Sequence, residues 1–205
     1  MKRFQLVCFL FSFFLLQESL KAAPALFSKL ETLDSVLHTV VPGDTLSELA
    51  QKYGTTVELL RGQNKISGDR IYVGMKLKVT QARFSIRIDK NRNLLVLLAD
   101  EKPLKRYRVA TGIEGSTPAG TFKIINKLEK PTWFHAGAVV PPDSPDNILG
   151  SRWLGFDSPG YGIHGTTLPE TIGTQASKGC IRMLNSDVEE LYAVVPLGTE
   201  VLVRD

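Results

Sequence analysis

The spacing of apolar residues changes at residues 81–82, and this change constrains the fold more than any other feature of the chain. Before it, helix-like spacing follows two Thr-x-x-Glu patterns, Thr45-x-x-Glu48 and Thr55-x-x-Glu58, each typical of a capping box. After it, apolar residues alternate or form short runs, as at 84–88 and 94–98. The sequence therefore predicts two units, a small helical one and a larger β-rich one, joined by only two residues.

The smaller unit spans residues 38–80 and has the predicted order β-α-α-β. We expect a strand at 38–41, two helices that begin at the capping boxes, and a strand at 76–79. A unit this short buries a modest core and depends on tight turns. Before it, residues 26–37 have apolar side chains at roughly helical spacing, which indicates a short helix or an ordered spacer.

The larger unit, residues 83–205, is predicted to be mainly β with one helix, so that the whole chain is α+β. The helix is expected to begin at a third capping box, Ser186-x-x-Glu189. Residues 130–146 are rich in proline, and we expect them to form a flap over a cleft, with Trp133 or Phe134 as an apolar wall. The predicted strands lie at 84–88, 94–98, 103–110, 121–125 and 201–203.

The first residues are typical of a signal peptide, with Lys2 and Arg3, an apolar run from Phe4 to Leu16, and small residues around Ala25. We expect residues 1–25 to be removed and the protein to be exported to the periplasm or cell envelope; an uncleaved anchor is the alternative. Cleavage removes Cys8 and leaves Cys180 unpaired in an oxidising compartment, where a free thiol is a liability unless it is used. It also lowers the net charge of +4, so nothing indicates nucleic acid as a partner.

Two segments carry the candidate chemistry, Ile163-His164-Gly165-Thr166 and Ser177-Lys178-Gly179-Cys180-Ile181-Arg182. A cysteine attacks carbonyl groups as the thiolate, and an imidazole can accept its proton near neutral pH. An isolated Cys or His is more often an inert buried group. Here the glycines and the cations on both sides of the thiol favour acyl transfer on a cysteine.

His-Gly-Thr, a short spacer and Ser-x-Gly-Cys-Ile-Arg together resemble the signature of the L,D-transpeptidase (YkuD-type) catalytic domain, although many members have His where this chain has Lys178. The resemblance implies that Cys180 is the nucleophile, that His164 is the base, and that the carbonyl of Gly165 orients His164. It also extends to the Thr-Pro-x-Gly turn within 116–121, expected to shape the catalytic face, and to 147–153, expected to be scaffold.

Around this pair, residue chemistry suggests further roles. We expect the N–H groups of Gly179 and Cys180 to bind the oxyanion and Lys178 to lower the thiol pKa. Ser177 is a hydrogen-bonding neighbour, and Arg182 meets either a substrate carboxylate or a structural partner. No cofactor is expected, and no metal, because His135, His164 and Cys180 follow no recognised ligand spacing.

Residues 38–80 resemble a LysM module, which implies binding to N-acetylglucosamine-containing glycan such as peptidoglycan. By this resemblance the groove lies between the first strand–helix loop and the second helix–strand loop; the alternative is that the first loop is only a helix cap. The nominated glycan-binding residues are Gly43, Asp44, Thr45, Asn64 and Ile66. The residues that carry the resemblance are Val41-Pro42-Gly43-Asp44-Thr45-Leu46, Ala50, Tyr53, Leu60, Asn64, Ile71, Gly74 and Leu77.

The expected function is therefore a cysteine-dependent L,D-transpeptidase that acts on peptidoglycan stem peptides through a thioester, held on the wall by LysM and serving cell-wall biogenesis and cell shape. Two alternatives remain open. One is a hydrolase with the same Cys/His pair, an L,D-carboxypeptidase or amidase. The other is a peptidoglycan-binding protein without catalysis. The residues do not indicate the oligomeric state.

Overall fold

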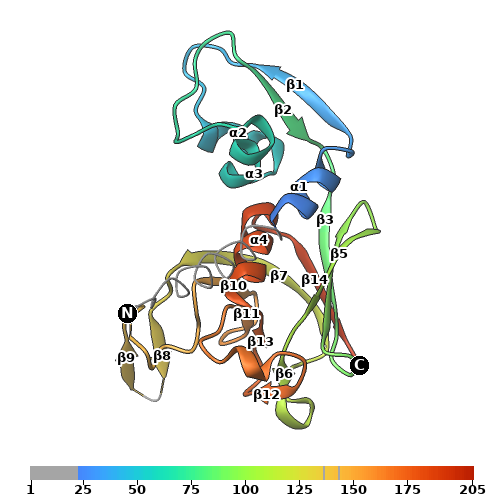
Figure 1. The fold of residues 1–205 in the computed structure, drawn as a ribbon, viewed down its shortest axis with the longest axis vertical. Helices are drawn as coiled ribbons and strands as arrows, with labels where there is room; N and C mark the ends of the chain where they lie inside the picture. The colour runs from blue at the N-terminus through green and yellow to red at the C-terminus, as the bar shows by residue number, and fades with distance from the viewer. Residues whose placement is uncertain (1–22, 136, 143) are drawn as a thin grey trace, which may run out of the picture.

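The structure is a computed structural model that describes residues 23–135, 137–142 and 144–205 (Figure 1). The predicted signal peptide lies outside the described residues as far as residue 22. No helix in the described ranges is both long and apolar enough to cross a membrane. Figure 1 shows the smaller unit at the top and the larger β unit below it.

The smaller unit has the predicted β-α-α-β order. Its strands β1 (Ser35–Thr39) and β2 (Lys76–Thr80) pair antiparallel, and α2 (Leu46–Tyr53) and α3 (Val57–Asn64) lie between them in the chain. β1 begins earlier than predicted because Ser35 pairs with Thr80. The first capping box is confirmed: the Thr45 hydroxyl accepts the Glu48 N–H, and the Glu48 carboxylate accepts the Thr45 N–H. α2 ends, as predicted, at Gly54, which has a left-handed conformation with φ 60°.

The second capping box is wrong by one residue. The N-cap of α3 is Thr56, whose hydroxyl accepts the Leu59 N–H at 2.9 Å, while the Thr55 hydroxyl is buried without a partner. With Thr56 as N-cap, Glu58 is the second residue of the helix instead of the third. Its carboxylate is therefore out of register for the reciprocal bond of a capping box.

The larger unit is mainly β, as predicted, and it is built on one eight-stranded sheet of order β13-β11-β10-β7-β14-β3-β4-β5. The C-terminal strand β14 lies inside this sheet, parallel to β3 and antiparallel to β7. The strands are β3 (Phe84–Asp89), β4 (Leu94–Ala99), β5 (Lys102–Arg108), β7 (Gly120–Glu129), β10 (Arg152–Phe156), β11 (Gly162–His164), β13 (Ile181–Arg182) and β14 (Glu200–Arg204). Two further pairs are β6 (Thr111–Gly112) with β12 (Gln175–Ser177), and β8 (Trp133–His135) with β9 (Ala138–Val140); 3-10 turns span Ile113–Gly115 and Pro169–Thr171.

In the described part of the larger unit the α-helix is α4 (Asn185–Val194), which packs Val188, Leu191 and Val194 against the sheet. The capping box predicted at Ser186 is wrong, because the N-cap of the helix is Leu184, two residues earlier, and Leu184 makes no side-chain hydrogen bond. Asn185 has a different role: its Oδ1 accepts the N–H groups of Ser151 and Thr166, both at 3.1 Å. The start of α4 thus ties together the segments on either side of β10 and β11.

The two units share a buried interface. The short helix indicated within residues 26–37 is present as α1 (Ala23–Leu30), but it ends at Leu30, and residues 35–37 belong to β1. Leu26 and Leu30 of α1 are fully buried in the same cluster as the sheet core. Leu59 of α3 belongs to that cluster too, whereas Leu60 belongs to the core of the smaller unit. The Thr56 hydroxyl donates to the Ala193 carbonyl of α4. Figure 1 shows α1 and α3 resting above α4.

Candidate active site

His164 and the residues around Cys180 lie on adjacent parallel strands. β11 pairs with β13 so that Ile163 faces Ile181 and His164 faces Arg182. The two isoleucines are buried in the core beneath α4, so His164 and Arg182 lie on the opposite face. Cys180 directly precedes β13, which puts it beside Gly162 and, by alternation, on that same face. Standard strand geometry then separates the Cα atoms of Cys180 and His164 by roughly 8 Å, a distance that two side chains can span.

The same face continues across β10 and β7, because Trp153 pairs with both His164 and Leu128, and Gly155 pairs with both Gly162 and Asn126. The face therefore has two parallel rows. One row bears large side chains and the other is bare in its middle. The rows are Arg182, His164, Trp153 and Leu128, and Cys180, Gly162, Gly155 and Asn126.

The indole of Trp153 lies across the two bare glycines. A Cβ added to Gly162 would stand 2.8 Å from this ring, and one added to Gly155 would stand 2.7 Å from its Nε1. Nε1 donates to Asn126 Oδ1 at 2.9 Å, and the ring stacks on the His164 imidazole with centroids 5.9 Å apart. Trp153 was missed as a site residue because it fell within the predicted scaffold stretch; its alternation with Gly155 was the available signal.

His164 is neutral in the resting site. Its Nδ1 lies 2.6 Å from the Gly165 carbonyl, which can only accept, so Nδ1 carries the proton and Nε2 is the basic atom. Burial lowers the pKa of His164 to about 4; the charge of Arg182 acts in the same direction, and hydrogen bonds to backbone groups of Gly165 and Leu149 oppose it. The contact expected between His164 and Gly165 is thus present.

Cys180 is a neutral thiol in the resting site. Its Sγ donates to the Gly160 carbonyl at 3.3 Å. Burial raises the pKa of the Cys180 thiol, against the opposing effects of a backbone hydrogen bond with Gly162 and the positive charge of Arg182. The positive charge of Arg182 therefore favours the thiolate. Lys178 is exposed, and the effect predicted for it on the thiol pKa stays a prediction.

Gly179 and Ser177 brace the loop that presents the thiol. The Gly179 N–H donates to Ser177 Oγ at 3.0 Å, and Ser177 Oγ donates to the Cys180 carbonyl at 2.6 Å. Because the Gly179 N–H already donates to Ser177 Oγ, it is not available for the oxyanion role predicted for it. The Cys180 N–H is then the candidate donor to the oxyanion. Glycine is required at 179, since its φ is 133° and an added Cβ would lie 2.7 Å from the Tyr161 ring and 3.1 Å from the Ser116 carbonyl.

The Arg182 guanidinium has an N–H group without a hydrogen-bond partner among the described residues. Its backbone makes two hydrogen bonds with Ala110, each 2.9 Å, but its side chain is 8 % exposed and its Nε has no partner among the described residues. Burial lowers the pKa of Arg182, against the charges of Cys180 and Glu170. An under-used buried guanidinium beside the thiol favours the substrate-carboxylate role over the structural one.

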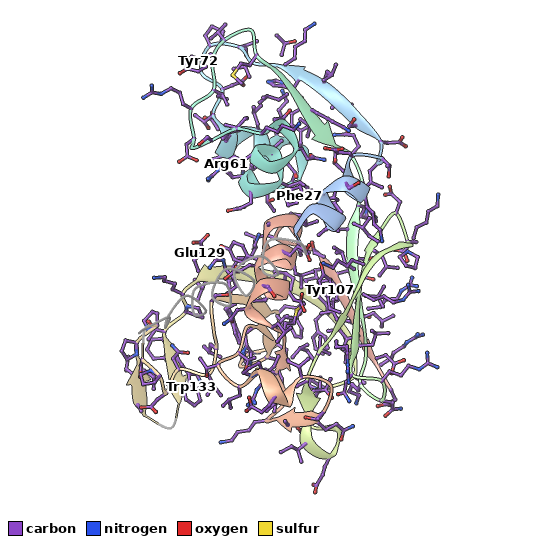
Figure 2. All side chains as sticks on the ribbon, viewed as in Figure 1. Phe27, Arg61, Tyr72, Tyr107, Glu129 and Trp133 are labelled. Atoms are coloured by element: carbon purple, nitrogen blue, oxygen red, sulfur yellow. The ribbon has the colours of Figure 1, made fainter. Side chains whose placement is uncertain are left out.

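A cavity of about 290 Å³ adjoins the thiol through Gly160. Trp133, predicted as its wall, is not among the lining residues; it lies on the β8–β9 hairpin at one side of the unit (Figure 2). Phe134 is 74 % exposed and points away from any core. The predicted flap is thus a hairpin, tied at its base by Asn147 Nδ2, which donates to Pro131, Val140 and Pro141 carbonyls. The cavity is lined by Ile125, Asn126, Trp153, Gly155, Phe156, Asp157, Pro159, Gly160 and Tyr161.

In the smaller unit the nominated polar residues are already engaged. Asp44 Oδ2 accepts from His38 Nε2 and the Val41 N–H, each at 2.8 Å, and Thr45 forms the capping box. The Asn64 amide clamps β2 through both the N–H and the carbonyl of Lys78.

These contacts favour a structural role for Asp44, Thr45 and Asn64. Gly43 has a φ of 95° in the first turn, and Ile66 packs partly against the core. An open cavity lies in the loop after α3, the second loop named by the prediction, and it is lined by Ser67, Gly68, Asp69, Arg70 and Tyr72 (Figure 2 labels Tyr72). No group of three His, Cys, Asp or Glu residues in the described ranges is arranged to hold a metal ion.

Comparison with known families identifies both units. The L,D-transpeptidase catalytic domain (YkuD) matches residues 83–203, and the LysM domain matches residues 38–80. The putative L,D-transpeptidase YqjB of Bacillus subtilis is 42% identical over 124 residues, covering 58% of this chain and 69% of that protein. The putative L,D-transpeptidase YkuD of Bacillus licheniformis is 33% identical over 174 residues, covering 81% and 97%.

Solved structures support the fold. L,D-transpeptidase 3 from Mycobacterium tuberculosis, in complex with a faropenem-derived adduct, aligns with a TM-score of 0.52 at 12% identity, over 84% of this chain and 92% of that one. An L,D-transpeptidase from Mycobacterium smegmatis aligns with a TM-score of 0.50 at 21% identity, over 65% of each chain.

Proposed function

Because the chain belongs to the YkuD family of L,D-transpeptidases and carries a LysM domain, we propose that it is a cysteine-dependent L,D-transpeptidase acting on peptidoglycan stem peptides. The observation that most supports this reaction is the pairing of β11 with β13, which sets His164 and Cys180 on one face, together with Arg182, whose charge acts on the pKa of both. The LysM domain holds the enzyme on wall glycan. Residues 38–80 are then the glycan-binding module and 83–205 the catalytic domain, of a protein exported to the cell envelope. The segment 26–37, predicted as a spacer, instead contributes to α1 and to the start of β1.

In the first step Cys180 Sγ attacks the carbonyl carbon of an L-centre to D-centre peptide bond. The S–C bond forms while the thiol proton passes to Nε2 of His164. The proton then moves to the leaving nitrogen, and the C–N bond breaks to give a thioester and a free amine. The Gly165 carbonyl holds Nδ1–H throughout, and the Trp153 ring lies against the transient imidazolium. The Cys180 N–H meets the oxyanion, an interaction worth about 3 kcal/mol in such sites.

In the second step an acceptor amine, such as that of a diaminopimelate side chain, attacks the thioester carbon. The N–C bond forms, the amine proton passes to Nε2 of His164, and the C–S bond breaks. The proton then returns to sulfur. With water in place of the amine the same steps give a hydrolase, the alternative function. Arg182 meets a carboxylate of the donor peptide, with Ser177 and Gly179 bracing the nucleophile loop.

The products distinguish these functions. Purified protein is incubated with disaccharide-tetrapeptide, and the mixture is analysed by mass spectrometry. Cross-linked dimer supports the transpeptidase, trimmed monomer supports the hydrolase, and unchanged substrate indicates a silent catalytic domain. Cys180→Ala is expected to abolish both products, and unchanged turnover in that variant would end the cysteine mechanism.

Binding to wall glycan is tested separately. We expect the protein to co-sediment with purified peptidoglycan even as the Cys180→Ala variant, because the LysM domain, residues 38–80, lies outside the catalytic domain. A protein that stays in the supernatant would contradict the anchoring role.

A further inference from the structure

The cavity beside Gly160 is lined by aromatic residues and by one carboxylate residue, Asp157. Its lining includes the aromatic residues Trp153 and Tyr161 and the exposed residue Asp157. Phe156 also lines it, although its ring is buried in the core and stacks on Phe122. Its volume of about 290 Å³ is at the small end of the range for ligand pockets, so it fits one side chain and not a whole stem peptide.

The cavity is adjacent to the reacting atoms on two sides. Gly160 lines it and also accepts the hydrogen bond of Cys180 Sγ at 3.3 Å. Trp153 lines it and also stacks on His164. A group that leaves this cavity therefore meets both the thioester carbon and the imidazole that takes its proton.

Asp157 is an oriented carboxylate. Its Oδ1 accepts the Lys123 N–H at 2.9 Å, and its own N–H donates to the Lys123 carbonyl at 3.0 Å. Among the residues that the structure describes, its Oδ2 makes no hydrogen bond, and the residue is exposed. A fixed carboxylate with a free oxygen at the rim of an apolar cavity suits a cation carried on an alkyl chain.

The two sides of the thiol differ in charge. Arg182, on β13, acts on the thiol from one side, and Asp157, after β10, lies beyond Gly160 on the other. A donor stem peptide brings carboxylates, which Arg182 attracts and Asp157 repels. An acceptor brings a primary amine, for which the preference is reversed.

We propose that this cavity is the acceptor subsite and that it takes an alkyl chain ending in a primary ammonium, which Asp157 holds and the aromatic walls cover. The inference rests on the transpeptidase function proposed above. One proton leaves the ammonium for water as it moves from Asp157 to the thioester. The neutral amine then forms the N–C bond, a second proton passes to His164 Nε2, and the C–S bond breaks.

The test uses Asp157→Asn in the full chain, because asparagine keeps an oxygen for the Lys123 N–H and removes only the charge. The matched control is Asp100→Asn, since Asp100 is also exposed and accepts a backbone N–H, that of Arg83, at 2.9 Å, but lies in the β4–β5 turn. Each protein is given disaccharide-tetrapeptide as donor. The acceptor is either an amine-bearing stem tetrapeptide or hydroxylamine, which is small and uncharged at neutral pH.

We expect Asp157→Asn to form the thioester on Cys180 at the wild-type rate and to react normally with hydroxylamine. Its kcat/KM for the stem-peptide amine falls about fivefold, the size of a solvent-screened ion pair, and the deficit shrinks as salt is added. Asp100→Asn behaves as wild type throughout.

Equal use of the stem-peptide amine by Asp157→Asn and wild type would overturn the subsite. So would an equal loss with hydroxylamine, because Asp157 would then act in an earlier step. Absence of a thioester in the wild-type protein would instead overturn the proposed function itself, an outcome that the first measurement separates from the others.

Discussion

His164 and Cys180 are both uncharged before the reaction, and this decides how the thiol is activated. Burial lowers the pKa of His164 and raises that of Cys180, so the resting pair is imidazole and thiol and not imidazolium and thiolate. The proton must therefore move as the sulfur attacks. Arg182 assists at the sulfur, because its charge stabilises the thiolate, whereas the same charge disfavours the imidazolium.

The pH dependence of kcat/KM reports the free enzyme's base. We expect the acid limb of this profile to lie near pH 4, the pKa of His164, and activity to be retained at pH 5.5, below the ordinary histidine pKa of about 6.5. The measurement is the rate of Cys180 acylation by a tetrapeptide donor across pH 3.5 to 8. An acid limb centred near pH 6.5 would contradict the neutral, buried imidazole.

The same pKa shift affects stability. A histidine with a depressed pKa in the folded state contributes stability that is present above its unfolded pKa of about 6.5 and is lost as pH falls through about 4. The loss is roughly 3 kcal/mol over this window, at about 1.4 kcal/mol per pKa unit.

Urea unfolding of wild type and His164→Gln at pH 7 and pH 4.5 measures the loss. The wild type is expected to lose more stability than the variant. An identical pH dependence in the two proteins would contradict the assigned pKa.

At the scale of elements, helix starts show what could and could not be predicted from the sequence. Three Thr/Ser-x-x-Glu patterns were interpreted as capping boxes, and one is real, at Thr45. At α3 an adjacent threonine competes for the N-cap. At α4 the Asn185 side chain accepts hydrogen bonds from Ser151 and Thr166, which are distant in the sequence. A local sequence pattern cannot predict such partners.

The capping geometry predicts different effects on stability for two alanine substitutions, one at Thr45 and one at Ser186. Thr45→Ala is expected to lower the free energy of unfolding by about 1 kcal/mol, because it removes the acceptor for the Glu48 N–H. Ser186→Ala is expected to change it by less than about 0.5 kcal/mol, because Ser186 is exposed and caps nothing. Chemical denaturation of both variants checks this. Equal losses would mean that Ser186 caps α4 after all.

Strand pairing explains why the His164 and Cys180 motif could be predicted from the sequence while Trp153 was missed. The sequence indicated the motif segments 163–166 and 177–182, but the register of β11 against β13, and so the shared face of His164 and Arg182, comes from long-range pairing. The same pairing brings Trp153 onto Gly155 and Gly162. The alternation of Trp153 with Gly155 was a local signal, but only the pairing of β10 with β11 brings Gly162 against the indole.

At the scale of the whole molecule, the two units share a buried interface although only Gln81 and Ala82 join β2 to the segment before β3. Leu26, Leu30 and Leu59 are fully buried in the core cluster of the larger unit. Phe27 of α1 lies over Gly62 of α3, where any side chain would displace its ring (Figure 2). The sequence indicated a helix before the first strand, but which core it joins depends on contacts far along the chain.

Neighbouring leucines of α3 test this interface. We expect the full chain to unfold in one thermal transition, and Leu59→Ala to lower the stability of the larger unit and separate two transitions, at a cost of about 2–5 kcal/mol. Leu60→Ala, the matched control, removes a side chain from the core of the smaller unit only. Calorimetry distinguishes them. Two independent transitions in the wild type would contradict a shared core.

The central claim is that one sulfur carries the acyl group, and the intact mass of the protein tests it most directly. After brief exposure to a tetrapeptide donor, the wild type is expected to gain the mass of the donor less its leaving residue, at Cys180, in an adduct that hydroxylamine removes. Cys180→Ala is expected to gain nothing. A wild type that turns over donor without ever carrying this adduct, or an adduct that persists in Cys180→Ala, would contradict the account.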